Sequence, residues 1–113
     1  MKPLRALDPA HMEEVRGLPC VVCVRLGLVQ TTHTEAHHIK RDPETGRVLG
    51  RGQKAPDTHT IPLCVRHHRE GAPGEAFHAT GRRRWEAAHG NELVLLHRTR
   101  ICLGIESVAP EAA

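Results

Sequence analysis

Apolar residues in this chain occur in short segments, and glycine and proline separate the segments from one another. Asp8-Pro9 places a good N-cap residue directly before a proline at the first helical position, and Gly17 is a suitable end for that helix. Residues 32–39 and 58–63 favour β-strands, although Pro62 restricts the second strand to a sheet edge or a strand end. The pattern predicts helices at 9–16, from about Cys64 onward, at 75–80 and at 82–89.

Three further segments complete this picture. The spacing of leucines in 92–103 fits one face of a helix, while its β-branched residues would also suit a strand, and we favour the helix. Residues 40–57 carry three glycines, two prolines and mixed charge, which predicts a long surface loop. The tail at 107–113 is expected to be flexible.

The composition predicts a thin hydrophobic core. The 113 residues suit one domain, and 25 of them are Leu, Ile, Val or Phe, about 22% of the chain. The aromatic residues are one Trp and one Phe. Small domains with such cores usually need an additional constraint, and a bound metal is the obvious one. We therefore expect one small α+β domain over residues 1–113 that a zinc ion holds together.

Charge and hydropathy narrow the choice of partners. The net charge of +3 gives weak support to nucleic-acid binding, although basic residues gather in the 40–57 loop and at 82–84, where they could meet phosphates. A solvated surface explains either patch equally well. The longest run of Leu, Ile and Val alone, Leu93–Leu96, is far too short to cross a membrane. The first residues lack the apolar region of a signal peptide, so we expect a cytoplasmic protein without a membrane partner.

The spacing of cysteine and histidine predicts a structural zinc site. Cys20-x-x-Cys23 supplies two thiolates from one tight turn. Cys64-x-x-His67 supplies a second pair, and forty residues lie between Cys23 and Cys64. A classical zinc finger separates its pairs by only about a dozen residues. A zinc ion on these four ligands would therefore join two remote parts of the chain.

Alternatives to this zinc site stay open. His68 and His78 compete with His67 as the fourth ligand. The cysteines could instead form two disulfides or a redox-active C-x-x-C pair, but a cytosolic chain keeps its thiols reduced, which favours metal. Cys102 stands alone and is expected to be a buried apolar residue.

More imidazoles are present than one zinc ion needs. On a strand, His37 and His38 point to opposite faces, so one can bind a metal while the other approaches a substrate. A one-metal phosphodiesterase needs those two roles, a divalent ion on the scissile phosphate and a neutral imidazole that takes a proton from the attacking water. Histidine can do this near neutral pH, because its unperturbed pKa is about 6.5.

The order of these motifs resembles the HNH endonucleases, also called ββα-metal or His-Me finger nucleases. The similarity is greatest to the phage-associated branch that includes the recombination-enhancement (Ref-like) nucleases, in which a helical Phe-His-x-x-Gly element often follows. It covers roughly residues 19–90. The residues that carry it are Cys20-x-x-Cys23, His37-His38-Ile39, Thr60-Ile61-Pro62-Leu63-Cys64-x-x-His67-His68 and Phe77-His78-Ala79-Thr80-Gly81.

The resemblance implies a ββα-metal core, a β-hairpin followed by a helix, with further helices around it. His37 and His68 match the ligands of a catalytic divalent metal, and His38 matches the general base. His59 stands where the family usually has Asn, a residue that braces the hairpin or binds the metal. The structural zinc knuckle is matched by Cys20, Cys23, Cys64 and His67.

Two departures from the family pattern leave the ligand set open. His59 replaces an asparagine and His67 replaces a cysteine of the knuckle, while Asp57 is another candidate oxygen ligand. The catalytic metal could be Mg²⁺, Mn²⁺, Ni²⁺ or Zn²⁺, although a histidine-rich site favours transition metals over Mg²⁺.

The implied activity is hydrolysis of DNA phosphodiester bonds, by nicking or cutting. A partner from phage recombination or packaging machinery could supply targeting. The competing hypothesis is a non-catalytic zinc module that binds DNA or a protein partner, which explains the zinc but not the surplus histidines. Candidate contacts to flanking phosphates are Arg41, Arg51, Lys54 and Arg66.

Overall fold

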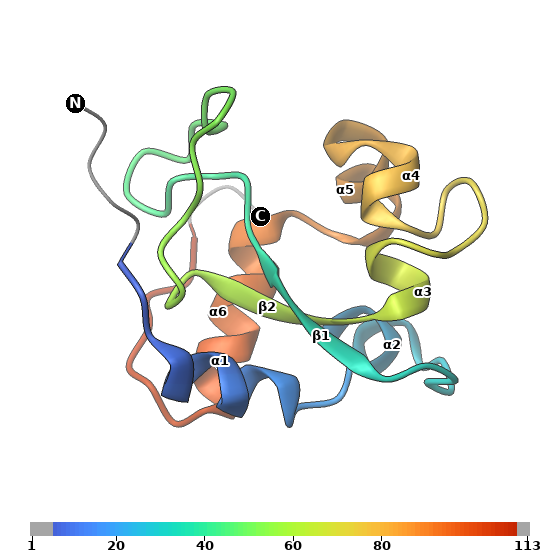
Figure 1. Cartoon of the computed structure of the whole chain (residues 1–113), viewed down its shortest axis with the longest axis horizontal. Helices are drawn as coiled ribbons and strands as arrows, with labels where there is room; N and C mark the ends of the chain where they lie inside the picture. The colour runs from blue at the N-terminus through green and yellow to red at the C-terminus, as the bar shows by residue number, and fades with distance from the viewer. Residues whose placement is uncertain (1–5, 111–113) are drawn as a thin grey trace.

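An antiparallel hairpin of two strands lies at the centre of the structure, a computed structural model that describes residues 6–110 (Figure 1). β1 spans Thr34–His38 and β2 spans Thr60–Cys64, and the two strands pair along their whole length. A sheet of two strands has only edges, so it tolerates Pro62 inside β2. Adjacent strand residues point to opposite faces, and accordingly His37 is buried whereas His38 is partly exposed.

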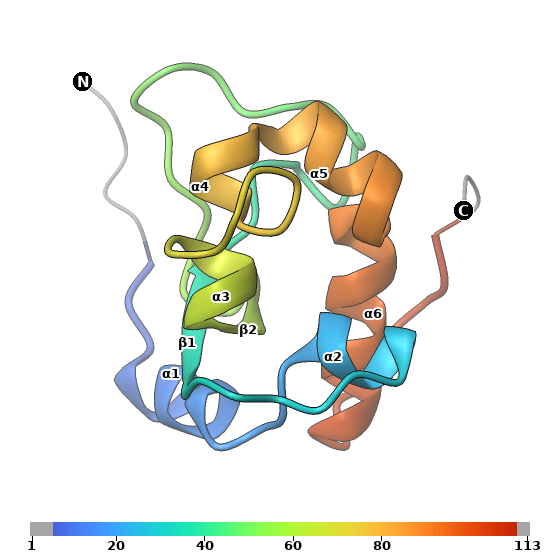
Figure 2. The same ribbon diagram turned by 90° about the vertical axis from the view of Figure 1, so that its right-hand side faces the viewer.

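Six helices surround this hairpin within residues 6–110, so the fold is α+β (Figures 1 and 2). α1 packs against both strands, α6 packs against β2, and α2 contacts both β2 and α6. α3 follows β2 directly and contacts α4, which leads into α5. The helices are α1 (Pro9–Arg16), α2 (Val21–Leu26), α3 (Val65–His68), α4 (Phe77–Thr80), α5 (Arg82–His89) and α6 (Glu92–Cys102).

Local capping explains two of the predicted helices. The Asp8 carboxylate accepts a hydrogen bond from the His11 N–H at the start of α1, which spans the predicted residues 9–16. At α6 the Asn91 side chain accepts a hydrogen bond from the N–H of Leu93. The helical interpretation of 92–103 is therefore confirmed.

The other predicted elements are also present; α5 has the predicted bounds 82–89, and the remaining elements have shifted boundaries. The predicted strands contain β1 and most of β2, and residues 40–57 form a loop with one isolated bridge between Arg41 and Val48. α2 was not predicted. The C-x-x-C turn continues as a helix because Val21 and Val22 are buried in the core, and it ends at Gly27, whose φ of 68° favours glycine.

The core lies between the hairpin and helices α2, α5 and α6. Trp85, Ile61 and Leu95 are fully buried in it, and the ring of Phe77 lies 5.2 Å from the ring of Trp85, centroid to centroid. The indole N–H of Trp85 donates to the carbonyl of His67 at 3.1 Å. This hydrogen bond fixes α5 against α3, the helix that carries two candidate metal ligands.

A close approach of backbone segments shapes the turn after α3. A Cβ atom on Gly71 would lie 2.1 Å from the carbonyl oxygen of Arg66, so this position requires glycine. The turn brings α4 back against α3, as Figure 2 shows. His78 of α4 thereby comes close to His68 of α3.

None of the helices in the described part of the chain is both long enough and apolar enough to span a membrane. At the start of the predicted flexible tail, Ser107 forms a hydrogen bond of 2.9 Å with His97. Positions 111–113 of that tail lie outside the described residues.

Candidate metal centres and active site

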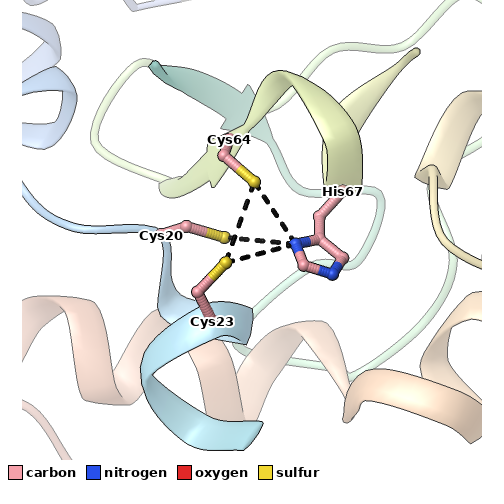
Figure 3. Close-up of side chains that lie close together, drawn as sticks. All are labelled: Cys20, Cys23, Cys64 and His67. Carbon is pink, nitrogen blue, oxygen red and sulfur yellow. Dashed lines mark hydrogen bonds between the residues drawn. The ribbon is translucent and has the colours of Figure 1, made fainter. Parts of the chain in front are cut away.

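Four buried side chains meet between the start of α2 and the end of β2 (Figure 3). Cys20 immediately precedes α2, and Cys23 lies one helical turn later. Cys64 is the last residue of β2, and His67 follows in α3. The cluster therefore joins segments that are 41 residues apart between Cys23 and Cys64. We call these four residues the knuckle.

The distances within the knuckle suit a tetrahedral ion. The sulfurs of Cys23 and Cys64 are 3.9 Å apart, and His67 Nδ1 lies 3.3, 3.6 and 3.7 Å from the sulfurs of Cys64, Cys23 and Cys20. Zn–S distances of about 2.3 Å and Zn–N distances of about 2.0 Å would set tetrahedral S–S edges near ~3.8 Å and S–N edges near ~3.5 Å. The knuckle could therefore hold a structural metal such as zinc, with His67 rather than His68 or His78 as the fourth ligand.

The state of the cysteines agrees with this role. All four cysteines of the chain, the three of the knuckle and Cys102, are free of disulfides. Burial raises the pKa of Cys20 and raises that of Cys23 to about 12, so a nearby cation is needed to keep these sulfurs as thiolates. Cys102 is exposed, and the expectation that it is buried is wrong. It lies at the end of α6, where its side chain faces outward beside Ile101, itself exposed.

A second cluster consists of three imidazoles, from His37 of β1, His68 of α3 and His78 of α4. Their ligand atoms all lie within 4.8 Å of one another, and the Nε2 atoms of His68 and His78 are 3.2 Å apart. His37 is buried, whereas His68 and His78 are progressively more open to solvent. We call these three residues the histidine cluster.

Carboxylates brace two of these imidazoles from behind. His37 Nε2 lies 2.8 Å from Glu92 Oε2, and His68 Nδ1 lies 2.8 Å from Glu35 Oε1. These bonds leave His37 Nδ1 and His68 Nε2 available to a ligand. Metal-binding histidines typically carry such a carboxylate on the other ring nitrogen, which orients the ring and raises its basicity.

The pKa values of His37 and His78 favour uncharged imidazole. Burial lowers the pKa of His37 well below its usual value, and the neighbouring positive groups, first His68 and then His78, lower it further. Burial also lowers the pKa of His78. Hydrogen bonds from Arg69 hold the pKa of Glu35 at about 2, so the carboxylate behind His68 is ionised. Neutral imidazole is the form that binds metal.

We expect Glu92→Gln to weaken metal binding at the histidine cluster by about 10- to 100-fold. Glu92 Oε1 accepts a hydrogen bond of 2.9 Å from the N–H of Lys40, and Oε2 lies 2.8 Å from His37 Nε2. Burial raises the pKa of Glu92 to about 7. In Glu92→Gln the Lys40 N–H would keep the amide oxygen, so that the NH₂ group would face His37 Nε2. Competition with a chromophoric chelator would measure the affinity, with Glu44→Gln in the exposed loop as control. Equal affinities in both variants would contradict the bracing role.

His38 borders the same hollow as the histidine cluster. This hollow has a volume of about 280 Å³, and His37, Lys40, Lys54, His68 and His78 also line it. The His38 side chain is about one-fifth exposed, and its Nε2 atom lies 2.8 Å from Asp57 Oδ1. The partly exposed residue His38 and the three convergent imidazoles thus line one open hollow.

The structure places His59 elsewhere. This residue lines a separate hollow together with Leu96, His97 and Arg100, not the hollow of the histidine cluster. Its backbone carbonyl accepts a hydrogen bond from the N–H of Ile39 at 3.1 Å, which extends the hairpin by one residue pair beyond β1. His59 thus stabilises the end of the hairpin through its main chain.

The four predicted phosphate contacts lie in different surroundings. Arg41 makes a bidentate ion pair with Glu86, and Arg66 makes an ion pair with Glu75. Arg51 is exposed in the 40–57 loop, and Lys54 lines the hollow of the histidine cluster. Lys54 is therefore the best placed of the four to meet a phosphate at this hollow. All four stay predictions as phosphate contacts.

Sequence reasoning did not assign His78, Glu92 and Glu35 to this site. His78 had a visible signal, because it belongs to the Phe-His-x-x-Gly element, but it was considered only for the knuckle. Glu92 is 55 residues from His37 and Glu35 is 33 residues from His68. Neither carboxylate lies in a motif with them.

Comparison with known proteins gives a family without an assigned activity. A family model described as "Protein of unknown function (DUF968)" matches residues 2–103, a span that includes every strand and helix from α1 to α6. No curated protein and no solved structure matches the chain.

Proposed function

Because this chain belongs to the DUF968 family of proteins of unknown function, we propose a function from its site: a metal-dependent endonuclease of the HNH type that hydrolyses DNA phosphodiester bonds. The observation that carries the proposal is the shared hollow of His38 and the histidine cluster. A protein that only binds DNA or a partner needs no second group of convergent imidazoles beside its structural metal site.

The arrangement of elements supports the same proposal. β1, β2 and α3 form a hairpin that runs directly into a helix, the order of a ββα-metal core. β1 contributes His37 and His38, and α3 contributes His68. Zinc in the knuckle would fix the junction of β2 and α3 from the other side.

The residues divide the chemistry between them. A divalent metal on His37, His68 and His78 would stabilise the negative charge that develops on the scissile phosphate. His38 takes the proton from the attacking water, for which it needs to be neutral and open to solvent. Lys40 and Lys54 at the rim of the hollow attract the DNA backbone by charge. We further propose that a phage recombination or packaging protein directs the enzyme to its DNA.

Cleavage of supercoiled plasmid tests the proposal, with Mg²⁺, Mn²⁺ or Ni²⁺ added to protein of known zinc content. We expect nicking that depends on the added metal, and His38→Ala should lower its rate by about 10²- to 10⁴-fold because water loses its proton acceptor. His97→Ala, which removes a histidine from the other hollow, is the control and should cleave like the wild type.

The opposite result is equally specific. If neither the wild type nor His38→Ala cleaves DNA with any of the three metals, and both still retard plasmid on a gel, the chain is a DNA-binding zinc module instead. Equal cleavage by His38→Ala and the wild type would remove His38 from the mechanism.

A further inference from the structure

The buried carboxylate of Asp57 contacts the Nε2 atom of His38. The side chain of Asp57 is only 7% exposed, and its Oδ1 atom lies 2.8 Å from His38 Nε2. Its Oδ2 atom accepts a hydrogen bond of 2.8 Å from the backbone N–H of Asp8. Asp57 does not line the hollow of the histidine cluster. Its carboxylate therefore contacts His38 at Nε2 from outside that hollow.

We propose that Asp57 is the positioning residue of His38, an inference that rests on the nuclease function proposed above. An ionised carboxylate only accepts hydrogen bonds, so it requires His38 to carry its proton on Nε2. The Nδ1 atom is then the one with a free lone pair, which can take a proton from water. The same division of labour between a buried carboxylate and a base histidine operates in hydrolytic triads.

The N-terminal segment completes this arrangement. The backbone N–H of Asp57 donates to the carbonyl of Ala6 at 3.0 Å, while the N–H of Asp8 holds Oδ2. Asp8 also caps α1, and α1 packs against both strands of the hairpin. Segment 6–8 therefore fixes the rotamer of Asp57, although the resemblance to HNH nucleases begins only near residue 19. α1 would thereby help to position His38, the proposed base.

Asp57→Asn is the sharpest test, because the N–H of Asp8 favours one orientation of the amide. The N–H of Asp8 needs an acceptor, so the amide oxygen occupies the Oδ2 position and the NH₂ group faces His38 Nε2. His38 must then accept at Nε2 and carry its proton on Nδ1, which can no longer receive one. We expect kcat for plasmid nicking to fall by about 10²- to 10⁴-fold, with KM for DNA and both metal contents unchanged.

The ring ¹⁵N chemical shifts of His38 provide a readout that does not depend on activity. We expect the wild type to show the pattern of a ring with its proton on Nε2, and Asp57→Asn to show the pattern of a ring with its proton on Nδ1. Asp42→Asn removes the same charge from an exposed turn and keeps its oxygen acceptor for the N–H of Glu44. This control should match the wild type in both rate and ¹⁵N shifts.

The outcomes separate the two proposals. Asp57→Asn with wild-type kcat, in a wild type that cleaves DNA, would overturn the role of Asp57 and leave the nuclease standing. A wild type that never cleaves would overturn the nuclease and, with it, the catalytic purpose of the pair. If Asp57→Asn does not fold, the wild-type spectrum decides: a His38 ring protonated at Nδ1 overturns the proposal, and one protonated at Nε2 supports it.

Discussion

Cys23→Ser is expected to unfold the chain at room temperature, as is removal of metal with a strong chelator. Zinc binding to a structural site contributes on the order of 10–16 kcal/mol, which is as large as the whole stability of a typical domain, about 5–15 kcal/mol. The core of this protein offers little compensation, because its buried hydrophobic residues include only two large aromatics, Phe77 and Trp85. Loss of one thiolate would leave three ligands and an open coordination position.

Circular dichroism and thermal unfolding would measure this effect, together with the zinc content of each protein. Cys102→Ser is a matched control, because Cys102 is the one cysteine that lies outside the knuckle and is exposed. We expect it to keep its zinc and its unfolding temperature. A Cys23→Ser protein that shows the wild-type unfolding transition without zinc would disprove the structural role of the knuckle.

His68→Ala is expected to reduce the metal content from two ions per chain to one and to abolish DNA cleavage. The remaining imidazoles, His37 and His78, would leave the ion with two protein ligands, too few for tight binding by a catalytic site of three. The fold should persist, because His68 is partly exposed and the knuckle does not include it. Glu35 also keeps its ion pair with Arg69.

Metal analysis after dialysis and the plasmid assay would measure both losses, with circular dichroism as the test of folding. His97→Ala should retain two ions and full cleavage. A His68→Ala protein that still binds two ions would show that the histidine cluster is not the second metal site. If the wild type itself never holds more than one ion under saturating Mn²⁺ or Ni²⁺, the proposal that the chain binds two metal ions is wrong.

Local signals in the sequence predicted those parts of the fold that local interactions form. The cap at Asp8 gave the exact bounds of α1, and the spacing of cysteines and His67 gave the knuckle. The glycine at position 27 is also a sequence signal for the end of α2, because a glycine that follows a helix often adopts positive φ, as Gly27 does. The helix itself was missed because the turn of the C-x-x-C motif was considered alone.

Long-range contacts explain what the sequence did not reveal. His78 reaches the histidine cluster only because the turn at Gly71 folds α4 back against α3. Glu92 reaches His37 only because α6 packs behind the hairpin. The basic residues show the same limit, since Arg41 and Arg66 look like free charges in the sequence and are paired with Glu86 and Glu75 in the fold. No local pattern specifies which carboxylate pairs with which arginine.

The four-residue helix α3 links the two candidate metal centres. His67 belongs to the knuckle and His68, its direct neighbour, belongs to the histidine cluster. A helix of one turn has no independent stability, so its orientation depends on its packing against the hairpin and α5 and, if the knuckle holds zinc, on that ion as well. Under the proposed function, zinc would therefore load first and the second metal afterwards. The fraction of chains with a filled knuckle would then set the ceiling on specific activity, and a cell short of zinc would contain inactive chains however much of the second metal it held.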